Sequence, residues 1–280
     1  MRLGGRRTSS NIEDRRGIRV GRAGGIGLGA VVLALIAAYF GMDPNVVLQT
    51  AQQSGGVQEE QVPYRESANE AQARELVSVV LADTEDTWSE IFAANGRTYE
   101  EPPLVLFSQA VQTACGVGES ASGPFYCPAD RKVYIDLTFY DELRQRFGAP
   151  GDFAQAYVIA HEIGHHVQTL LGISARTHAA RSRAGQAEAN ALSVRQELQA
   201  DCFAGLWAHN AERSRPFLEA GDIEEGLTAA SAIGDDRLSQ GRAPPESITH
   251  GTSEQRVRWF KRGLDTGSMQ ECDTFGARSL

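Results

Sequence analysis

The sequence has 280 residues but only four cysteines, and no two of them form a C-x-x-C pair. A zinc site built from cysteines is therefore not expected. Positive charge is also scarce over most of the chain. The first 22 residues carry seven of the 27 basic and two of the 36 acidic side chains, so the remainder has 20 basic and 34 acidic side chains. An acidic body of this kind argues against nucleic acid as a partner.

Charge is absent altogether from one long stretch near the N-terminus, residues 24–42. Nineteen helical residues at about 1.5 Å each just span the hydrocarbon core of a bilayer. Seven arginines precede this stretch, so the positive-inside rule predicts a cell-membrane protein with one crossing, a cytoplasmic N-terminus and an extracytoplasmic body. A cleaved signal peptide is the alternative. The long basic region before the stretch and the lack of an A-x-A site after it favour an uncleaved anchor.

The apolar stretch divides the chain into four predicted parts. Residues 43–66 contain several glutamines and a Ser-Gly-Gly run but no apolar period, which is typical of a flexible linker. The sequence contains no internal repeat. We therefore predict a basic cytoplasmic tail over residues 1–23, a transmembrane helix over residues 24–42, the linker over residues 43–66 and a folded catalytic domain over residues 67–280.

The folded domain contains the pattern His161-Glu162-Ile163-Gly164-His165. An α-helix has about 3.6 residues per turn, so residues four apart share one face. His161 and His165 can therefore point an imidazole nitrogen at the same zinc ion, as in the H-E-x-x-H motif. Glu162 lies beside that position, where its carboxylate can accept a proton from a water molecule. The alternative is a helix whose two histidines are satisfied by other partners and bind no metal.

The residues around this motif predict a buried helix. Asp152 and Gln155 have the spacing of a capping box, which begins a helix, and Gly172 is a natural residue to end it. Between them almost every face is apolar, so the helix should be buried. Buried imidazoles and a buried carboxylate need partners, and a metal ion supplies one.

A hydrolytic zinc site needs a third protein ligand and an open position for water. Glu197 and Asp201 lie four residues apart in a helical stretch over about residues 186–210, so they share a face. We predict that Glu197 binds the zinc and that Asp201 accepts the free ring N–H of a ligand histidine. A solvated helix charge is the alternative interpretation of Glu197. The remaining candidate ligands are His166, His178, His209 and His250.

These motifs resemble those of the bacterial putative neutral zinc metallopeptidase family, a zincin-type family whose third ligand is read as glutamate. The likeness rests on H-E-I-G-H-H-V-Q at residues 161–168 and E-L-Q-A-D at residues 197–201. It extends from about residue 64 to residue 263, with further matching stretches at residues 115–116, 123–130, 133–136, 151–160 and 250–256. At the metal positions this sequence has the residues of the family, so the resemblance implies a zinc peptidase site. It implies less about the substrate of that site.

The remaining patterns predict a mainly helical α+β domain of zincin type with a small antiparallel sheet. Residues 104–107 and 132–138 have the composition of strands. In a zincin, an edge strand beside the cleft pairs with the backbone of the substrate. By resemblance, residues 133–137 are the candidate for that strand.

The four cysteines, at positions 115, 127, 202 and 272, allow three disulfide pairings. Cys115 and Cys127 enclose a short loop rich in turn residues and are the favoured pair, which leaves Cys202 with Cys272. An extracytoplasmic domain favours such bonds. Buried free thiols are the alternative.

Together these observations predict a membrane-anchored zinc metalloendopeptidase that holds one Zn²⁺ and hydrolyses peptides or proteins outside the cytoplasmic membrane. Glu162 is the expected general base, and His250 is a candidate donor to the oxyanion. Arg256 is a candidate to orient Asp201 or another carboxylate. The alternative is an inactive, zinc-stabilised scaffold that binds envelope proteins. The presence of Glu162 argues against a scaffold, because a structural zinc site has no use for a base.

Overall fold

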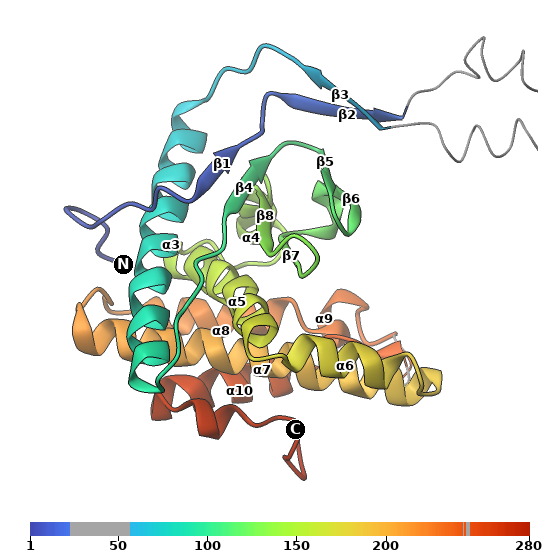
Figure 1. The fold of residues 1–280 in the computed structure, drawn as a ribbon. Helices are drawn as coiled ribbons and strands as arrows, with labels where there is room; N and C mark the ends of the chain where they lie inside the picture. Colours follow the sequence, from blue (N-terminus) through green and yellow to red (C-terminus); the bar gives the residue numbers. More distant parts are fainter. Residues whose placement is uncertain (23–56, 243, 245–246) are drawn as a thin grey trace, which may run out of the picture.

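The computed structural model describes residues 1–22, 57–242, 244 and 247–280. Helices dominate, which confirms the predicted α+β, mainly helical class, and Figure 1 shows α5 between the small sheet and a layer of α7, α8 and α10. In chain order the elements are β1 (Ile12–Asp14), β2 (Ile18–Arg22), β3 (Val57–Gln61), α3 (Ala68–Ala94), β4 (Leu104–Phe107), β5 (Ala110–Thr113), β6 (Gly116–Glu119), η1 (Ser120–Ser122), β7 (Phe125–Cys127), β8 (Lys132–Asp136), α4 (Phe139–Gln145), α5 (Asp152–Leu170), α6 (Ile173–Arg181), α7 (Gln186–Ser214), α8 (Asp222–Ala232), α9 (Asp235–Leu238), α10 (Ser253–Thr266) and η3 (Met269–Cys272).

The largest sheet is mixed rather than antiparallel, which corrects the prediction. Its strand order is β1-β4-β8-β7, in which β1, β4 and β8 are parallel and only β7 runs antiparallel to its neighbour. Strand β8 pairs on both sides, so residues 133–137 are not the open edge that was expected. The fully buried side chains of Val133 and Ile135 suit an interior strand. The edge strand next to α5 is β7.

Residues 1–22, which we call the N-terminal arm, are part of the folded domain and not a separate tail. Strand β1 extends the sheet parallel to β4, and β2 pairs antiparallel with β3, which lies in the predicted linker (Figure 1). Further backbone hydrogen bonds join the arm to the body, among them Ser9 N to Ser78 O at 3.0 Å and Arg2 N to Phe217 O at 2.9 Å. Strands β1 and β2 thus pair with strands beyond the predicted boundary at residue 23, and β3 lies before the predicted boundary at residue 67.

The charges of the N-terminal arm are neutralised by the body. Glu85 of α3 is 1% exposed and accepts hydrogen bonds from Arg7, Ser9 and Asn11. Arg16 is 4% exposed and lies between the carboxylates of Asp14 and Glu66. A buried carboxylate that loses its partners costs several kcal/mol, about 3–5. Three of the arginines that suggest a cytoplasmic tail by count thus have carboxylate partners many positions away in the sequence, namely Arg6, Arg7 and Arg16.

The predicted transmembrane helix, residues 24–42, lies outside the described residues. Among the helices of the described part, none is both long and apolar enough to cross a membrane. The register of β2 and β3 places Arg22 opposite Val57, so the two ends of the undescribed segment 23–56 are neighbours. One crossing between them would put paired strands on opposite sides of a membrane. The pairing therefore favours an N-terminal arm on the same side as the body, while the location of both stays a prediction.

Both favoured disulfides are present. Cys115 and Cys127 lie 5.9 Å apart and Cys202 and Cys272 lie 5.6 Å apart, measured between Cα atoms, and all four sulfurs are bonded in these pairs. The first bond ties the β5–β6 hairpin to the end of edge strand β7. The second ties η3 to α7, one residue after Asp201. The C-terminal segment is thereby fixed beside the helix that carries the predicted third ligand.

The start of α5 differs from the prediction. Gly151, not Asp152, is the N-cap, and no side chain of the cap residue accepts a hydrogen bond from the helix. Glu225 of α8 accepts from the Phe153 amide at 3.1 Å instead, while the Asp152 carboxylate binds the ammonium group of Met1 at 2.8 Å. A tertiary contact thus replaces the local capping box.

We predict that the N-terminal arm and the body lie on the same side of a membrane. All native cysteines are oxidised, so Ser10→Cys in the arm and Ser182→Cys after α6, both at exposed positions, each introduce the one free thiol. A membrane-impermeant maleimide applied to intact cells should label both variants or neither. Labelling of one without the other would show that a crossing separates the arm from the body.

Candidate active site

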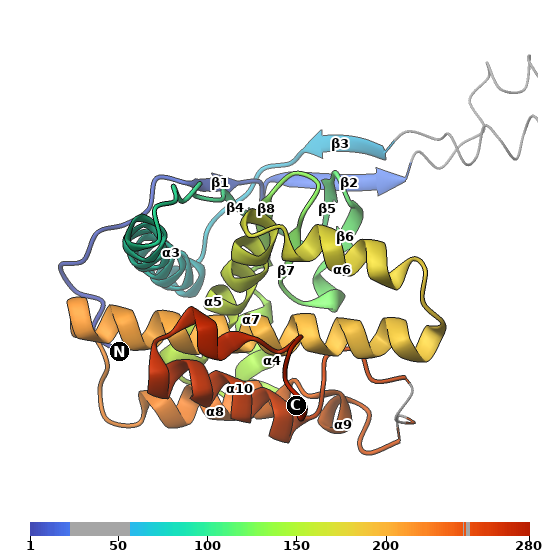
Figure 2. The ribbon, with the colours of Figure 1, turned by 60° about the horizontal axis from the view of Figure 1, so that its bottom comes forward.

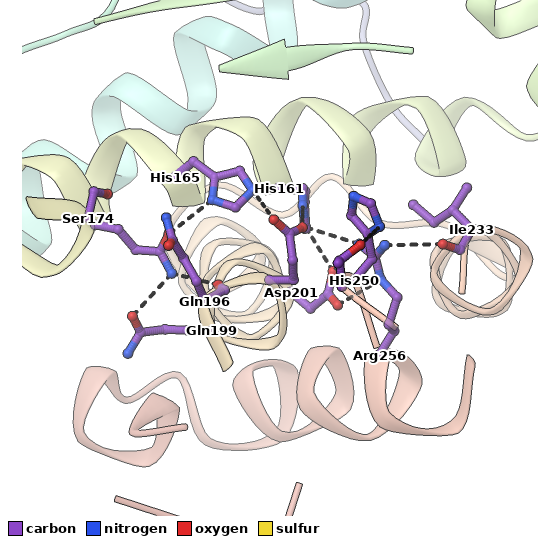
Figure 3. Close-up of polar contacts among 12 residues, drawn as sticks. His161, His165, Ser174, Gln196, Gln199, Asp201, Ile233, His250 and Arg256 are labelled. Carbon is purple, nitrogen blue, oxygen red and sulfur yellow. Dashed lines mark hydrogen bonds and ion pairs between the residues drawn. The ribbon is translucent and has the colours of Figure 1, made fainter. Parts of the chain in front are cut away.

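The site begins with a close crossing of α5 and α7. Gly164, inside the H-E-x-x-H motif, lies against Ala200: a Cβ added to the glycine would be 3.0 Å from both the Cα and the carbonyl oxygen of Ala200. Only a residue without a side chain allows this approach without displacing the backbone. The motif histidines, one on either side of Gly164 along α5, therefore face Glu197 and Asp201, which flank Ala200 on α7. Figure 3 shows His161, His165 and Asp201.

The structure brings the three predicted zinc ligands together. Nε2 of His161 lies 3.2 Å from one carboxylate oxygen of Glu197, and Nε2 of His165 lies 3.5 Å from the other. One ligand atom from each of the three residues lies within 4.8 Å of the others. Tetrahedral zinc with ligands at about 2.0–2.1 Å separates them by about 3.3 Å, so this donor set fits zinc. The assignment of these residues as ligands remains a prediction.

His161 is buried, His165 and Glu197 are partly buried, and Glu197 and each histidine shift one another's pKa. Burial lowers the pKa of His161, but the charge and hydrogen bond of Asp201 and the hydrogen bond of Glu197 outweigh it and raise that pKa to about 9. Burial raises the pKa of Glu197, but the two histidines outweigh this effect and hold that pKa well below its usual range. The carboxylate is thus ionised at neutral pH, as a metal ligand must be.

Asp201 forms a hydrogen bond with His161. The Asp201 side chain is fully buried and accepts a hydrogen bond from Nδ1 of His161 at 2.8 Å, which leaves Nε2 free to face the metal position. Arg256 of α10 donates to both oxygens of Asp201, each at 2.9 Å (Figure 3). Tyr157 donates to one of them at 2.5 Å. Burial raises the pKa of Asp201, but Arg256 and His161 outweigh it, so the pKa is lowered.

A hydrogen bond to Gln168 orients His165 in the same way, and the sequence analysis did not predict it. Its Nδ1 donates to the side-chain oxygen of Gln168 at 2.9 Å, and the amide nitrogen of Gln168 donates to Gln196 O at 2.7 Å. Gln168 lies three residues after His165, and Tyr157 lies four residues before His161. These spacings place each side chain on the face of its histidine, so helical periodicity contained the signal.

Two of the other candidate histidines, His166 and His209, form hydrogen bonds outside the three-donor cluster. His166 is fully buried, donates from Nε2 to the carbonyl oxygen of Glu100 at 2.6 Å and accepts from the Tyr126 hydroxyl at 3.1 Å. His209 donates to Leu264 O at 2.7 Å. Neither belongs to the donor cluster.

His250, the candidate oxyanion donor, lies in the loop before α10 and is held by Asp235. Asp235 is the first residue of α9, and sequence reasoning did not single it out. One of its oxygens lies 3.0 Å from Nδ1 of His250, and the other accepts from the backbone amides of Thr249 and His250 at 2.6 and 2.8 Å. The hydrogen bond from Asp235 raises the pKa of His250. With Nδ1 engaged, Nε2 is the ring nitrogen available to a ligand.

One cleft of about 560 Å³ collects these groups. It is lined on one side by His161, Glu162, His165, Glu197 and His250, and Arg256 also reaches it. Burial raises the pKa of Glu162 above its usual range. The cleft has the size of a ligand pocket, typically about 300–1,000 Å³. A carboxylate beside a three-donor cluster, in a cleft open to ligands, can perform general acid–base chemistry next to a metal.

The comparisons with known proteins agree with this geometry. The family model described as putative neutral zinc metallopeptidase matches residues 1–275, a range that includes the N-terminal arm. The chain is 51% identical over 290 residues to the uncharacterized protein YpfJ of Escherichia coli K12, which covers 99% of both chains. It is 39% identical over 260 residues to the uncharacterized protein Mb2605 of Mycobacterium bovis, which covers 87% of this chain and 86% of the relative. No solved structure matches the chain significantly.

We predict that zinc content depends on Glu197 more than on its neighbours. Glu197→Ala should lose most of the bound zinc after dialysis, because two imidazoles remain. Asp201→Asn keeps the side-chain size but removes the charge behind His161, so zinc affinity should fall about 10–100-fold. Glu188→Ala, an exposed residue in the first turn of the same helix, is the matched control and should bind zinc normally. Full zinc in folded Glu197→Ala protein would disprove the assignment of the third ligand.

Proposed function

Because the chain belongs to the putative neutral zinc metallopeptidase family, we propose that it is a zinc-dependent metalloendopeptidase that hydrolyses peptide bonds. His161, His165 and Glu197 are its proposed ligands for one Zn²⁺. The observation that carries the proposal is the cluster of three donors, in which Nε2 of His161 and Nε2 of His165 lie 3.2 and 3.5 Å from the two oxygens of Glu197, on the wall of a cleft that also contains Glu162. Peptides or proteins are the proposed substrates, and the acidic body speaks against nucleic acid.

The residues of the cleft have separate roles in the proposed reaction. When bound, zinc supplies the Lewis acidity that polarises the attacking water and the scissile carbonyl. Glu162 accepts the proton of that water and transfers it to the leaving amine, so that no proton is lost overall. His250 donates from Nε2 to the carbonyl oxygen as negative charge develops on it. Asp201 and Arg256 keep His161 in one orientation.

The arrangement favours an enzyme over a zinc-stabilised scaffold. A structural zinc site is closed by four protein ligands. Here the cluster offers three donors, and the cleft beside them is open to solvent. Glu162 is a buried carboxylate next to this cluster, and burying a carboxylate is costly without a function or a partner to offset it.

For the location, we propose an extracytoplasmic body held at the cell membrane by residues 24–42. The two disulfides support an oxidising compartment, since such bonds are rare in the cytosol. The pairing of β1 with β4 supports a location of the N-terminal arm on the same side as the body. The membrane association itself rests on the sequence alone.

Glu162→Gln tests the proposed chemistry. Glutamine keeps the size of the side chain but cannot accept the proton, so the rate of peptide cleavage should fall about 10²–10⁴-fold while zinc content is unchanged. Glu188→Gln, an exposed position on α7, serves as the control and should keep full activity. Cleavage by the Glu162→Gln enzyme at the wild-type rate would exclude this residue as the base.

A second substitution tests the oxyanion donor. His250→Ala removes one donor to the developing charge, so kcat should fall about 10²–10³-fold with a small change in KM. Asp235→Asn should have a smaller effect on kcat, because the imidazole remains but its orientation is less fixed. Steady-state kinetics on a single peptide substrate separates the two quantities. An unchanged kcat in His250→Ala would remove His250 from the reaction.

A further inference from the structure

The hydrogen bonds behind His165 continue past Gln168 to the C-terminal segment. The side-chain nitrogen of Gln168 donates to the side-chain oxygen of Gln199 at 3.1 Å as well as to the carbonyl oxygen of Gln196 at 2.7 Å (Figure 3). The side-chain nitrogen of Gln199 donates in turn to the carbonyl oxygen of Cys272 at 2.9 Å. We call the side chains of Gln168 and Gln199 the glutamine bridge. It joins a proposed zinc ligand on α5 to η3.

Two backbone carbonyls set the direction of every hydrogen bond in the glutamine bridge. A carbonyl oxygen only accepts, so the side-chain nitrogen of Gln199 faces Cys272 and its oxygen faces Gln168. By the same argument the side-chain nitrogen of Gln168 faces the carbonyl of Gln196, and its oxygen faces His165. Nδ1 of His165 must then carry a proton, and Nε2 is the nitrogen left for the metal position. The C-terminal segment thus helps to decide which ring nitrogen can bind zinc.

The glutamine bridge is shielded from water. Gln168 is fully buried and Gln199 is 5% exposed, so water does not replace a partner that is removed. If the Gln168 amide turned over, its oxygen would face the oxygens of Gln196 and Gln199, and its nitrogen would face the Nδ1–H of His165. Both contacts would be repulsive. Gln199 therefore holds the Gln168 amide in the one orientation that accepts from His165.

One face of α7 anchors the far end of the glutamine bridge. Gln199 and Cys202 lie three residues apart on this helix, and both bind Cys272, the first at its carbonyl oxygen and the second through the disulfide. Arg195, four residues before Gln199, donates to the carbonyl oxygen of Ala277 at 3.1 Å. The disulfide thus holds the Cys272 carbonyl within reach of Gln199.

From these observations we propose that Gln199 is a positioning residue for His165, and that zinc affinity depends on the Cys202–Cys272 disulfide through it. The inference rests on the proposed zinc peptidase function and adds a control on its metal site. Both cysteines are fully buried, so thiols in solution do not reach this bond in the folded chain. A chain in which the bond has not formed would therefore hold zinc more weakly than the oxidised chain does.

The first measurement is the zinc affinity of the full-length chain, by competition with a chromogenic chelator and without any peptide. Gln199→Leu removes both hydrogen bonds of that side chain, and the affinity should fall about 10-fold, the lower end of the range for partners of metal ligands. Gln186→Leu, at an exposed glutamine in the first turn of α7, is the matched control and should bind zinc as the wild type does. Wild-type affinity in folded Gln199→Leu protein would overturn the proposal.

A double-mutant cycle shows whether Gln199 acts through Gln168. Gln168→Leu removes the acceptor of the His165 Nδ1–H directly, so it should weaken zinc binding at least as much as Gln199→Leu does. If the effect of Gln199 passes through Gln168, the double variant should lose no more affinity than Gln168→Leu alone. Losses that multiply in the double variant would show that Gln199 acts independently and would contradict the glutamine bridge.

A spectroscopic measurement separates this inference from the proposed function. In protein with ¹⁵N-labelled histidine, the Nδ1 proton of His165 should exchange with water about 10-fold faster in Gln199→Leu than in the wild type, with or without zinc. The Nδ1 proton of His161, which binds Asp201, is the internal control and should not change. If the wild type binds no zinc, the proposed function fails, and this comparison still decides the glutamine bridge. Equal exchange of the His165 proton in both proteins would contradict it.

The two disulfides provide matched variants for the dependence on oxidation. Replacing Cys202 and Cys272 by alanine frees the C-terminal segment and should lower zinc affinity about 10-fold. Replacing Cys115 and Cys127 by alanine removes a bond that does not touch the glutamine bridge and should leave the affinity unchanged. If the first pair does not fold, Arg195→Met loosens the same segment with both disulfides intact and should also lower the affinity. Equal zinc affinity in folded variants would show that this segment does not act on the metal site.

Discussion

The close crossing of α5 and α7 at Gly164 and Ala200 is the constraint on which the site depends. It brings the two helices near enough for two imidazoles from one and a carboxylate from the other to share a single metal position. A side chain at residue 164 would separate the helices and the three donors with them. The crossing alone does not orient the ligands, however. His161 is oriented by Asp201, and Asp201 is held in turn by Arg256.

Helix α10 extends this network across the molecule. It packs so closely on α7 that a Cβ at Gly205 would be 2.0 Å from the carbonyl oxygen of Phe260, and the Cys202–Cys272 bond locks the segment that follows α10 to the same helix (Figure 2). On the other face, the N-terminal arm completes the sheet and neutralises Glu85 of α3. Residues on both sides of the undescribed segment 23–56 therefore contribute to one folded body.

The sequence was most informative where function depends on local spacing. The spacings of the motif histidines and of the pair Glu197 and Asp201 follow helical periodicity, and the structure brings His161, His165 and Glu197 together and joins Asp201 to His161. It was least informative where long-range pairing decides. Nothing local showed that Asp152 would bind Met1 rather than cap its helix, or that the basic N-terminus would become a strand. The positive-inside rule counts arginines but not their partners.

The ligand shell of the bound metal is the quantity that tests this account most directly. X-ray absorption at the zinc edge, on protein loaded with one equivalent of zinc, should show two imidazole nitrogens and two to three oxygens at about 2.0–2.2 Å. No sulfur shell at about 2.3 Å is expected, because all four cysteines are in disulfides. A sulfur shell, or a third imidazole in place of the carboxylate, would contradict the site that the crossing of α5 and α7 builds.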